Sequence, residues 1–164
     1  MNDAELYGLA DRAGRELLRR GQRLATAESC TGGWIAEALT AVPGSSAWFE
    51  ASVVTYSNEA KQSLLGVPGS MLQSHGAVSE ATVRAMAAGV LARTRASLAI
   101  AVSGIAGPSG GTPGKPVGTV WVAWLSRDSS VDRVTRLALA GNREGIRRGA
   151  VVAAIEGLLD AAGT

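Results

Sequence analysis

The stretch with the clearest capacity for chemistry is residues 26–34, which read Thr-Ala-Glu-Ser-Cys-Thr-Gly-Gly-Trp. It follows a short apolar run and precedes apolar residues at three- and four-residue spacing, which indicates a strand, a turn of small residues and a helix. The free N–H groups in the first turn of such a helix attract anions and oxyanions. Ser29 on this turn is therefore a candidate nucleophile. A second interpretation is that Ser29 or Thr31 only caps the helix.

Lys61 is the candidate base for such a serine, and it is one of only two lysines in the chain. A neutral lysine needs burial that lowers its pKa by about three units, which is roughly 4 kcal/mol. A helix start beside a sheet could supply that environment, with Tyr56 as a hydroxyl that relays a proton. The alternative is an exposed helical lysine. Neither a Ser-x-x-Lys motif nor a spacing that links Ser29 to the lone His75 is present.

A glycine-rich loop at residues 103–116 holds five glycines and three prolines. Main-chain N–H groups with little side-chain bulk can cradle a phosphate. Neither the Gly-x-Gly-x-x-Gly motif nor a P-loop is present, and Pro116 stands where a P-loop needs Ser or Thr. The alternative is a flexible connection between two strands.

Composition favours a packed globular protein and argues against several classes of partner. Hydrophobic residues make up 46% and charged residues 18%. A net charge of +2, no long basic run and 4% aromatic residues argue against nucleic-acid binding. The lone cysteine, Cys30, excludes an intrachain disulfide, and the lone His75 removes most metal-site patterns. An acidic N-terminus and no long apolar span predict a cytoplasmic protein without a membrane partner.

The elements that must position these residues alternate mostly as strand, helix and strand. This order predicts a single domain over residues 1–164, a three-layer α/β/α sandwich with a mixed, mostly parallel five-stranded sheet. The last two strands are joined by only five residues, so they should pair antiparallel. Residues 73–76 are predicted to form a turn, and Asn58 to cap its helix. Strands are expected near 22–27, 51–56, 98–102, 117–125 and 131–139, and helices near 6–18, 31–41, 58–65, 80–91 and after residue 142.

Ligands of open α/β sheets bind outside the carboxyl ends of parallel strands. Three unusual segments fall there, at residues 28–33, 56–61 and 103–116, after the first, second and third predicted strands. The strand pattern thus predicts that these three segments meet at one end of the sheet and form a single site.

Several long segments of the chain resemble the CinA C-terminal domain family. The resemblance runs from the first predicted helix to the last. It implies a mixed five-stranded sheet between helices, in agreement with the pattern, and the stand-alone form without the N-terminal domain of larger CinA proteins. The matching segments are Thr26–Gly33, Gly44–Phe49, Val54–Lys61, His75–Ser79, Ser103–Pro108 and Lys115–Val120.

This resemblance implies an amidase that converts nicotinamide mononucleotide to nicotinate mononucleotide and ammonia, without a metal or organic cofactor. It implies Ser29 as the nucleophile, Lys61 as the base and Tyr56 as an assisting group. Turn amides would hold the oxyanion, while the glycine-rich loop and an arginine would hold the phosphate. The residues expected to bind substrate are Glu28, Cys30, Thr31, Gly32, Ser103, Gly104, Ile105, Ala106, Gly107 and Arg143.

Two other functions remain open on the sequence. The chain could be a catalytically silent module that senses a pyridine nucleotide, but such a sensor would not need Ser29, Tyr56 and Lys61 together. It could also be a competence-related interaction module, although the weak charge pattern argues against direct contact with nucleic acid. A homodimer is expected from the frequency of two-fold assemblies.

Overall fold

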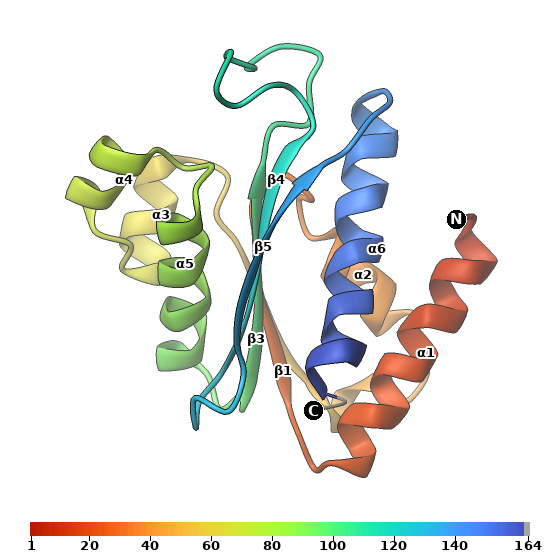
Figure 1. Ribbon diagram of the computed structural model, residues 1–164. Coiled ribbons are helices and arrows are strands. Elements are labelled where there is room, and N and C mark those ends of the chain that lie inside the picture. The colour runs from red at the N-terminus through yellow and green to blue at the C-terminus, as the bar shows by residue number, and fades with distance from the viewer. Residues whose placement is uncertain (163–164) are drawn as a thin grey trace.

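The computed structural model describes residues 1–162 and has three layers, with one sheet between two groups of helices (Figure 1). Helices α1, α2 and α6 cover one face of the sheet, and α3, α4 and α5 cover the other. This confirms the predicted α/β/α sandwich. The strands are β1 (Leu24–Glu28), β2 (Phe49–Val54), β3 (Leu98–Gly104), β4 (Thr119–Ser126) and β5 (Asp132–Ala138). The helices are α1 (Asp3–Arg19), α2 (Trp34–Thr40), the 3-10 turn η1 (Ser45–Ala47), α3 (Asn58–Leu65), α4 (Gly69–His75), α5 (Glu80–Arg93) and α6 (Arg143–Ala162).

The sheet has the order β2-β1-β3-β4-β5, with β1 between the two strands that run parallel to it. β4 pairs antiparallel with both β3 and β5, so β4 alone runs against the other four strands. The sheet is therefore mixed, as predicted. The helix after β1 lies on one face and the helix after β2 on the other, so the chain leaves these neighbouring strands in opposite directions (Figure 1). Ligand crevices of open α/β sheets form at such a switch point.

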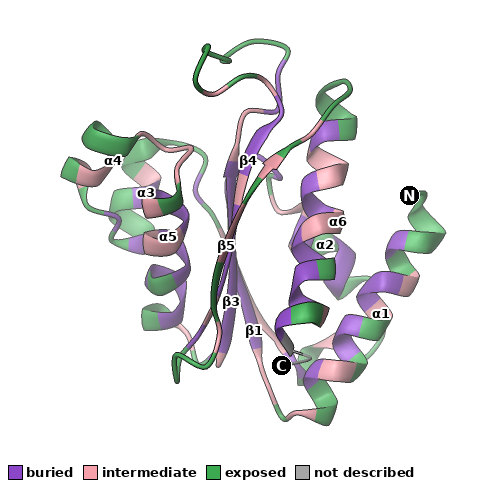
Figure 2. Ribbon diagram, in the orientation of Figure 1, coloured by how far each residue is buried: buried purple, intermediate pink, exposed green. Residues whose placement is uncertain are grey.

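The continuous apolar run at residues 98–102 forms β3, a central strand that is buried on both faces. Leu98, Ile100 and Val102 belong to the core against α1, α2 and α6. Ala99 and Ala101 belong to the opposite core, against α5. Side chains alternate between the two faces of a strand, so a strand covered on both sides must be apolar at every position. The buried residues in Figure 2 follow the sheet and the inner faces of the helices.

Two local predictions were wrong. Residues 73–76 are not a simple turn, because Gly69–His75 forms α4, which begins after Pro68 and ends at Gly76 with a positive φ of 76°. Proline is favoured at a helix start and glycine just past its end, and these two residues mark the bounds of α4. Asn58 does not cap α3, because the side chain of Ser57 accepts the Ala60 amide at 3.0 Å.

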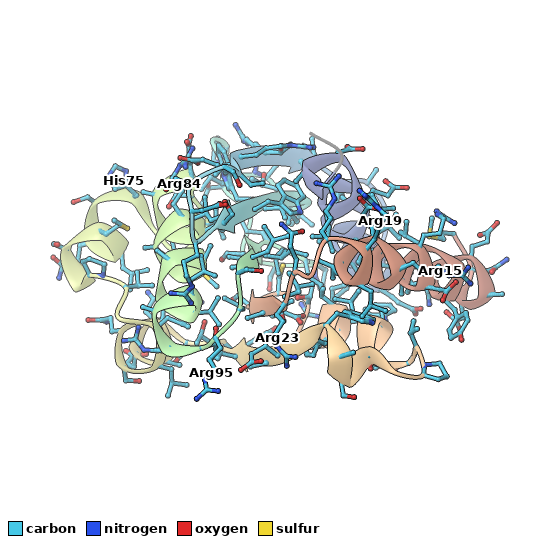
Figure 3. All side chains as sticks on the ribbon, turned by 90° about the horizontal axis from the view of Figure 1, so that it is seen from below. Arg15, Arg19, Arg23, His75, Arg84 and Arg95 are labelled. Carbon is cyan, nitrogen blue, oxygen red and sulfur yellow. The ribbon has the colours of Figure 1, made fainter. Side chains whose placement is uncertain are left out.

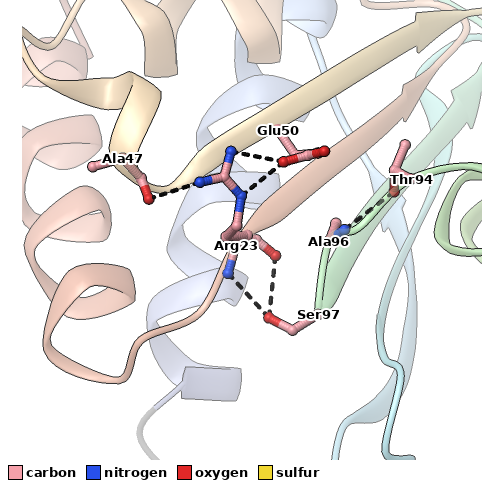
Figure 4. Close-up of polar contacts among 6 residues, drawn as sticks. All are labelled: Arg23, Ala47, Glu50, Thr94, Ala96 and Ser97. Atoms are coloured by element: carbon pink, nitrogen blue, oxygen red, sulfur yellow. Dashed lines mark hydrogen bonds and ion pairs between the residues drawn. The ribbon is translucent and has the colours of Figure 1, made fainter.

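The amino ends of the central strands are joined by polar contacts at the end of the sheet opposite the loop between β3 and β4. Arg23 Nε donates to Glu50 at 2.7 Å, and its Nη1 donates to the carbonyl of Ala47 at 3.2 Å (Figure 4). The Arg23 amide donates to Ser97 Oγ at 3.0 Å, just before β3. These contacts tie the residue before β1 to the segments that lead into and form its two neighbours.

None of the helices in the described part of the chain is both long and apolar enough to cross a membrane. Over the same residues, no group of three or more His, Cys, Asp or Glu side chains is placed to hold a metal ion.

Candidate active site

The carboxyl ends of β2, β1 and β3 bring the three predicted segments together. Ser29 follows β1 directly, Lys61 lies in α3 after β2, and Ser103 lies at the end of β3. All three line one pocket of about 280 Å³, together with Cys30 and Tyr56. The convergence expected from the strand pattern is therefore present in the structure.

Ser29 and Lys61 are in direct contact at the base of this pocket. Nζ of Lys61 donates to Ser29 Oγ at 3.1 Å and to the carbonyl of Thr55 at 2.8 Å. The Lys61 side chain is only 1% exposed, and Ser29 is 8% exposed. The interpretation of Lys61 as an exposed helical lysine is therefore wrong, because α3 turns it toward the sheet.

Burial lowers the pKa of the Lys61 amine below its ordinary value, because the charged form loses its hydration. The hydrogen-bond partners of Nζ are a hydroxyl and a carbonyl. Among the described residues, no carboxylate bonds to it. A neutral amine can accept the Ser29 proton through the same short contact. Burial raises the pKa of the neighbouring Cys30 thiol to about 11, so that thiol stays protonated near neutral pH.

The turn after β1 is held by the carboxylate of Glu28, which is fully buried. This carboxylate accepts the amides of Gly33, Ile35 and Ala36 at 3.0, 3.1 and 2.9 Å, and the Thr31 hydroxyl at 2.6 Å. It thereby satisfies the free N–H groups at the start of α2. Residue Gly33 occupies the N-cap position and makes no side-chain bond, so neither serine nor threonine caps this helix. The Ser29 hydroxyl does not cap the helix and instead accepts a hydrogen bond from Lys61.

We expect Glu28→Gln to destabilise the protein by about 2–4 kcal/mol, because an amide group directs donors at backbone N–H groups and loses the favourable charge at the helix start. Urea unfolding measures this change. Glu37→Gln is the matched control, since Glu37 is an exposed acid in the first turn of the same helix and should cost under about 1 kcal/mol. Equal losses for the two variants would contradict the assignment of Glu28 as the group that holds the turn.

Two main-chain amides of this turn are candidate donors to a ligand. Those of Cys30 and Thr31 donate to no other residue within residues 1–162. The Gly32 amide was expected to be a free donor. In the structure it donates to the carbonyl of Ser29 at 3.0 Å instead. An oxyanion beside Ser29 therefore has two candidate donors rather than three.

Tyr56 lies at the mouth of the pocket and is 62% exposed. Its hydroxyl accepts Arg143 Nη2 at 2.9 Å, while Arg143 Nη1 donates to the carbonyl of Gly107 at 2.8 Å. Arg143 thus bridges the segments that follow β2 and β3. Over the described residues, no hydrogen bond joins Tyr56 to Ser29 or Lys61, so its assisting role stays a prediction.

The segment 103–107 forms another part of the pocket wall. The Ile105 amide donates to the Thr119 carbonyl at 2.9 Å, so this part of the loop is paired with the start of β4. The amides of Ala106 and Gly107 have no acceptor among residues 1–162. These amides and the guanidinium of Arg143 are donors of the kind that bind phosphate.

The structure separates the predicted binding residues into three groups. Glu28 lies under the turn and lines neither of the two cavities beside it in the described part of the chain. Thr31 and Gly32 line a second cavity of about 620 Å³, between α2 and α6, that shares Arg143 with the first. The remaining ones line the pocket with Ser29: Cys30, Ser103, Gly104, Ile105, Ala106, Gly107 and Arg143.

The pocket also contains residues that the sequence argument did not assign to it: Asn58, Ala77, Val78, Ser109 and Gly110. Each lies within or beside a segment that already carried a signal, either the family resemblance or the glycine-rich loop. His75 is different, because it is the last residue of α4 and is exposed at the edge of the molecule (Figure 3). Its carbonyl accepts Lys115 Nζ at 2.7 Å, and no side-chain bond ties it to the site within residues 1–162.

Taken together, these features define a three-layer α/β protein with a hydroxyl and a buried amine at the switch point of its sheet. Residues 6–162 match the family described as the CinA C-terminal domain, and the chain belongs to that family.

Relatives in this family are similar to this chain in both sequence and structure. The nicotinamide-nucleotide amidohydrolase PncC of Escherichia coli K12 is 49% identical over 159 residues, covering 96% of this chain and 95% of that protein. The protein of the same name from Pseudomonas putida is 55% identical over 151 residues, covering 92% and 93%. The crystal structure of the competence/damage inducible protein CihA from Agrobacterium tumefaciens superposes with a TM-score of 0.93 at 42% identity, covering 100% of this chain and 98% of that one.

Proposed function

We propose that this protein hydrolyses the carboxamide of nicotinamide mononucleotide to nicotinate mononucleotide and ammonia. The observation that carries the proposal is the 3.1 Å contact between Ser29 Oγ and the buried Nζ of Lys61. Burying a charged amine without a paired carboxylate costs stability and lowers the pKa of the amine, and groups with shifted pKa values gather at active sites. The substrate follows from the relatives named nicotinamide-nucleotide amidohydrolase, at 49% and 55% identity over most of the chain.

In the first half of the reaction Lys61 takes the proton of Ser29, and Oγ attacks the carboxamide carbon. The amides of Cys30 and Thr31 hold the oxyanion of the tetrahedral intermediate. Its collapse breaks the C–N bond, and Lys61 returns the proton to the leaving ammonia. The product of this half is an ester between Ser29 and the nicotinate group of the nucleotide.

In the second half water attacks the ester, and Lys61 again accepts a proton and returns it to Ser29 Oγ. Arg143, with the free amides of Ala106 and Gly107, binds the phosphate of the nucleotide and keeps the ring at Ser29. Tyr56, which Arg143 already contacts, lies beside the substrate at the pocket mouth. Glu28 serves the site indirectly, by holding the turn.

The direct test is to incubate the purified protein with nicotinamide mononucleotide and to measure ammonia and nicotinate mononucleotide. We expect both products in equal amounts. A folded, monodisperse sample that binds the nucleotide but releases no ammonia over a broad pH range would favour a pyridine-nucleotide sensor instead.

The rate should depend on pH through Lys61. The active form has a neutral amine, so kcat/KM should rise as pH increases through the pKa of Lys61 and then level off. Because burial lowers that pKa, the midpoint should lie below the ordinary value of 10.5. A pH profile of kcat/KM measures it. A rate that falls as pH rises toward 10.5 would contradict a lysine base.

We further propose that the chain acts as one domain over residues 1–164, in the cytoplasm, in the salvage of pyridine nucleotides. The family match over residues 6–162 supports the single domain. A homodimer is the proposed assembly, because closed two-fold dimers are the commonest oligomers. Light scattering coupled to size-exclusion chromatography tests the assembly.

A further inference from the structure

Arg147 of α6 contacts the back of the turn that carries Ser29. Its Nε donates to the carbonyl of Cys30 at 3.1 Å, and its Nη2 donates to the carbonyl of Thr31 at 2.9 Å. The side chain is half-buried and its guanidinium lies 5.3 Å from the centre of the Trp34 ring. One arginine, more than 110 residues away in sequence, therefore fixes two successive peptide groups.

The direction of these peptide groups follows from covalent geometry. In a trans peptide the C=O and the following N–H point in opposite directions. The carbonyl of Cys30 points at Arg147, so the N–H of Thr31 points away from Arg147. The carbonyl of Thr31 is held in the same way, and the N–H of Gly32 accordingly turns to the carbonyl of Ser29 at 3.0 Å.

The turn also separates two cavities. Arg147 lines the larger cavity, together with Thr31 and Gly32, whereas Ser29 and Cys30 line the pocket that contains Lys61. A donor that points away from Arg147 is therefore directed to the side of the turn where Ser29 lies. A guanidinium bound to a carbonyl also polarises that peptide group and strengthens its N–H as a donor.

We infer that Arg147 is a positioning residue for the oxyanion site: it orients and polarises the Cys30–Thr31 peptide so that the Thr31 N–H stabilises the tetrahedral intermediate. The inference rests on the proposed function for its assay. Arg147 lines the larger cavity rather than the pocket with Ser29 and Lys61, so we expect it to act through the peptide group. Its removal should therefore slow the chemical step and leave nucleotide affinity nearly unchanged.

Arg148 provides a matched control on the same helix. Its guanidinium lies 4.9 Å from the centre of the Trp34 ring, and it forms ion pairs with Asp3 and Glu144. No hydrogen bond joins it to the turn within residues 1–162. Arg147→Met and Arg148→Met each remove one cation from Trp34, but only the first releases the two carbonyls.

The experiment measures kcat and KM for nicotinamide mononucleotide in both variants. For Arg147→Met we expect kcat to fall about 10²-fold or more, the usual effect of losing one oxyanion donor, with KM within a few-fold of wild type. Arg148→Met should keep kcat within a few-fold. Arg147→Lys, which retains a cationic donor, should recover part of the lost kcat. Equal kcat values for the two methionine variants, or a loss confined to KM, would overturn the inference.

A second measurement does not depend on the substrate. A fluorophosphonate probe labels a reactive serine when Oγ displaces fluoride from phosphorus, and its phosphoryl oxygen uses the same donors. Labelling of Ser29 should slow in Arg147→Met and not in Arg148→Met. Wild-type protein that is labelled at Ser29 but releases no ammonia from the nucleotide would refute the proposed substrate and leave this comparison intact.

If Arg147→Met fails to fold, Arg147→Gln replaces it in both measurements, and wild-type rates in that variant would overturn the inference.

Discussion

Ser29→Ala is expected to lower the rate of ammonia release from nicotinamide mononucleotide by about 10⁴-fold or more, the scale on which removal of a nucleophile acts in serine hydrolases. The variant lacks the atom that forms the ester. Nucleotide binding should stay within a few-fold of wild type, because Arg143 and the amides at 106 and 107 are untouched. An ammonia assay gives the rate, and isothermal titration calorimetry gives the affinity.

The competing interpretation of Ser29 makes a different prediction. A serine that only caps a helix would, when replaced by alanine, cost about 1 kcal/mol of stability and leave the rate largely intact. In the structure Glu28 satisfies the start of α2, and the Ser29 hydroxyl contacts Lys61 instead. A melting curve for Ser29→Ala close to that of wild type, together with the loss of turnover, would separate the two interpretations.

Lys61→Met and Lys61→Arg are both expected to lower kcat/KM by about 10²–10⁴-fold, the usual contribution of a general base. Methionine fills a similar volume without an amine. Arginine keeps a positive charge but cannot lose its proton near neutral pH, so it cannot act as the base. Wild-type turnover in either folded variant would remove Lys61 from the mechanism.

Lys61→Met should also change how stability depends on pH. Unfolding exposes the lysine, and its pKa returns to the ordinary value of 10.5. Between the lowered folded pKa and 10.5 the unfolded chain binds a proton that the folded chain does not, so wild-type stability rises with pH in that window. The stability of Lys61→Met relative to wild type should therefore be greatest at low pH and decline as pH approaches 10.5, which urea unfolding across that range would measure. A difference that does not change with pH would contradict the burial of a neutral amine.

The sequence identified the elements of the site because each has a strong local pattern. Ser29 lies on a turn of small residues between an apolar strand and a periodic helix. The continuous run at 98–102 indicated a strand covered on both faces, as β3 is. Three predicted strands, each followed by a segment of unusual residues, sufficed to predict that these segments meet.

The contacts that decide chemistry came only from the structure, because they join distant parts of the chain. The burial of Lys61 depends on how α3 packs against the rest of the protein, and the local sequence left a buried and an exposed lysine as alternatives. Arg143 meets Tyr56 across 87 residues of sequence. The role of Glu28 was missed for a related reason: its carboxylate reaches amides five to eight residues ahead, beyond the spacing of ordinary helix caps.

The most direct test of the account is to look for the ester on Ser29. Enzyme mixed with excess nicotinamide mononucleotide is quenched in acid at short times, digested, and its peptides are analysed by mass spectrometry. The account predicts that the peptide containing Ser29 carries the nicotinate mononucleotide acyl group, and that added hydroxylamine intercepts it as the hydroxamate. An acyl group found on Lys61 or Tyr56, or ammonia released with neither a Ser29 adduct nor a hydroxamate, would contradict Ser29 as the nucleophile.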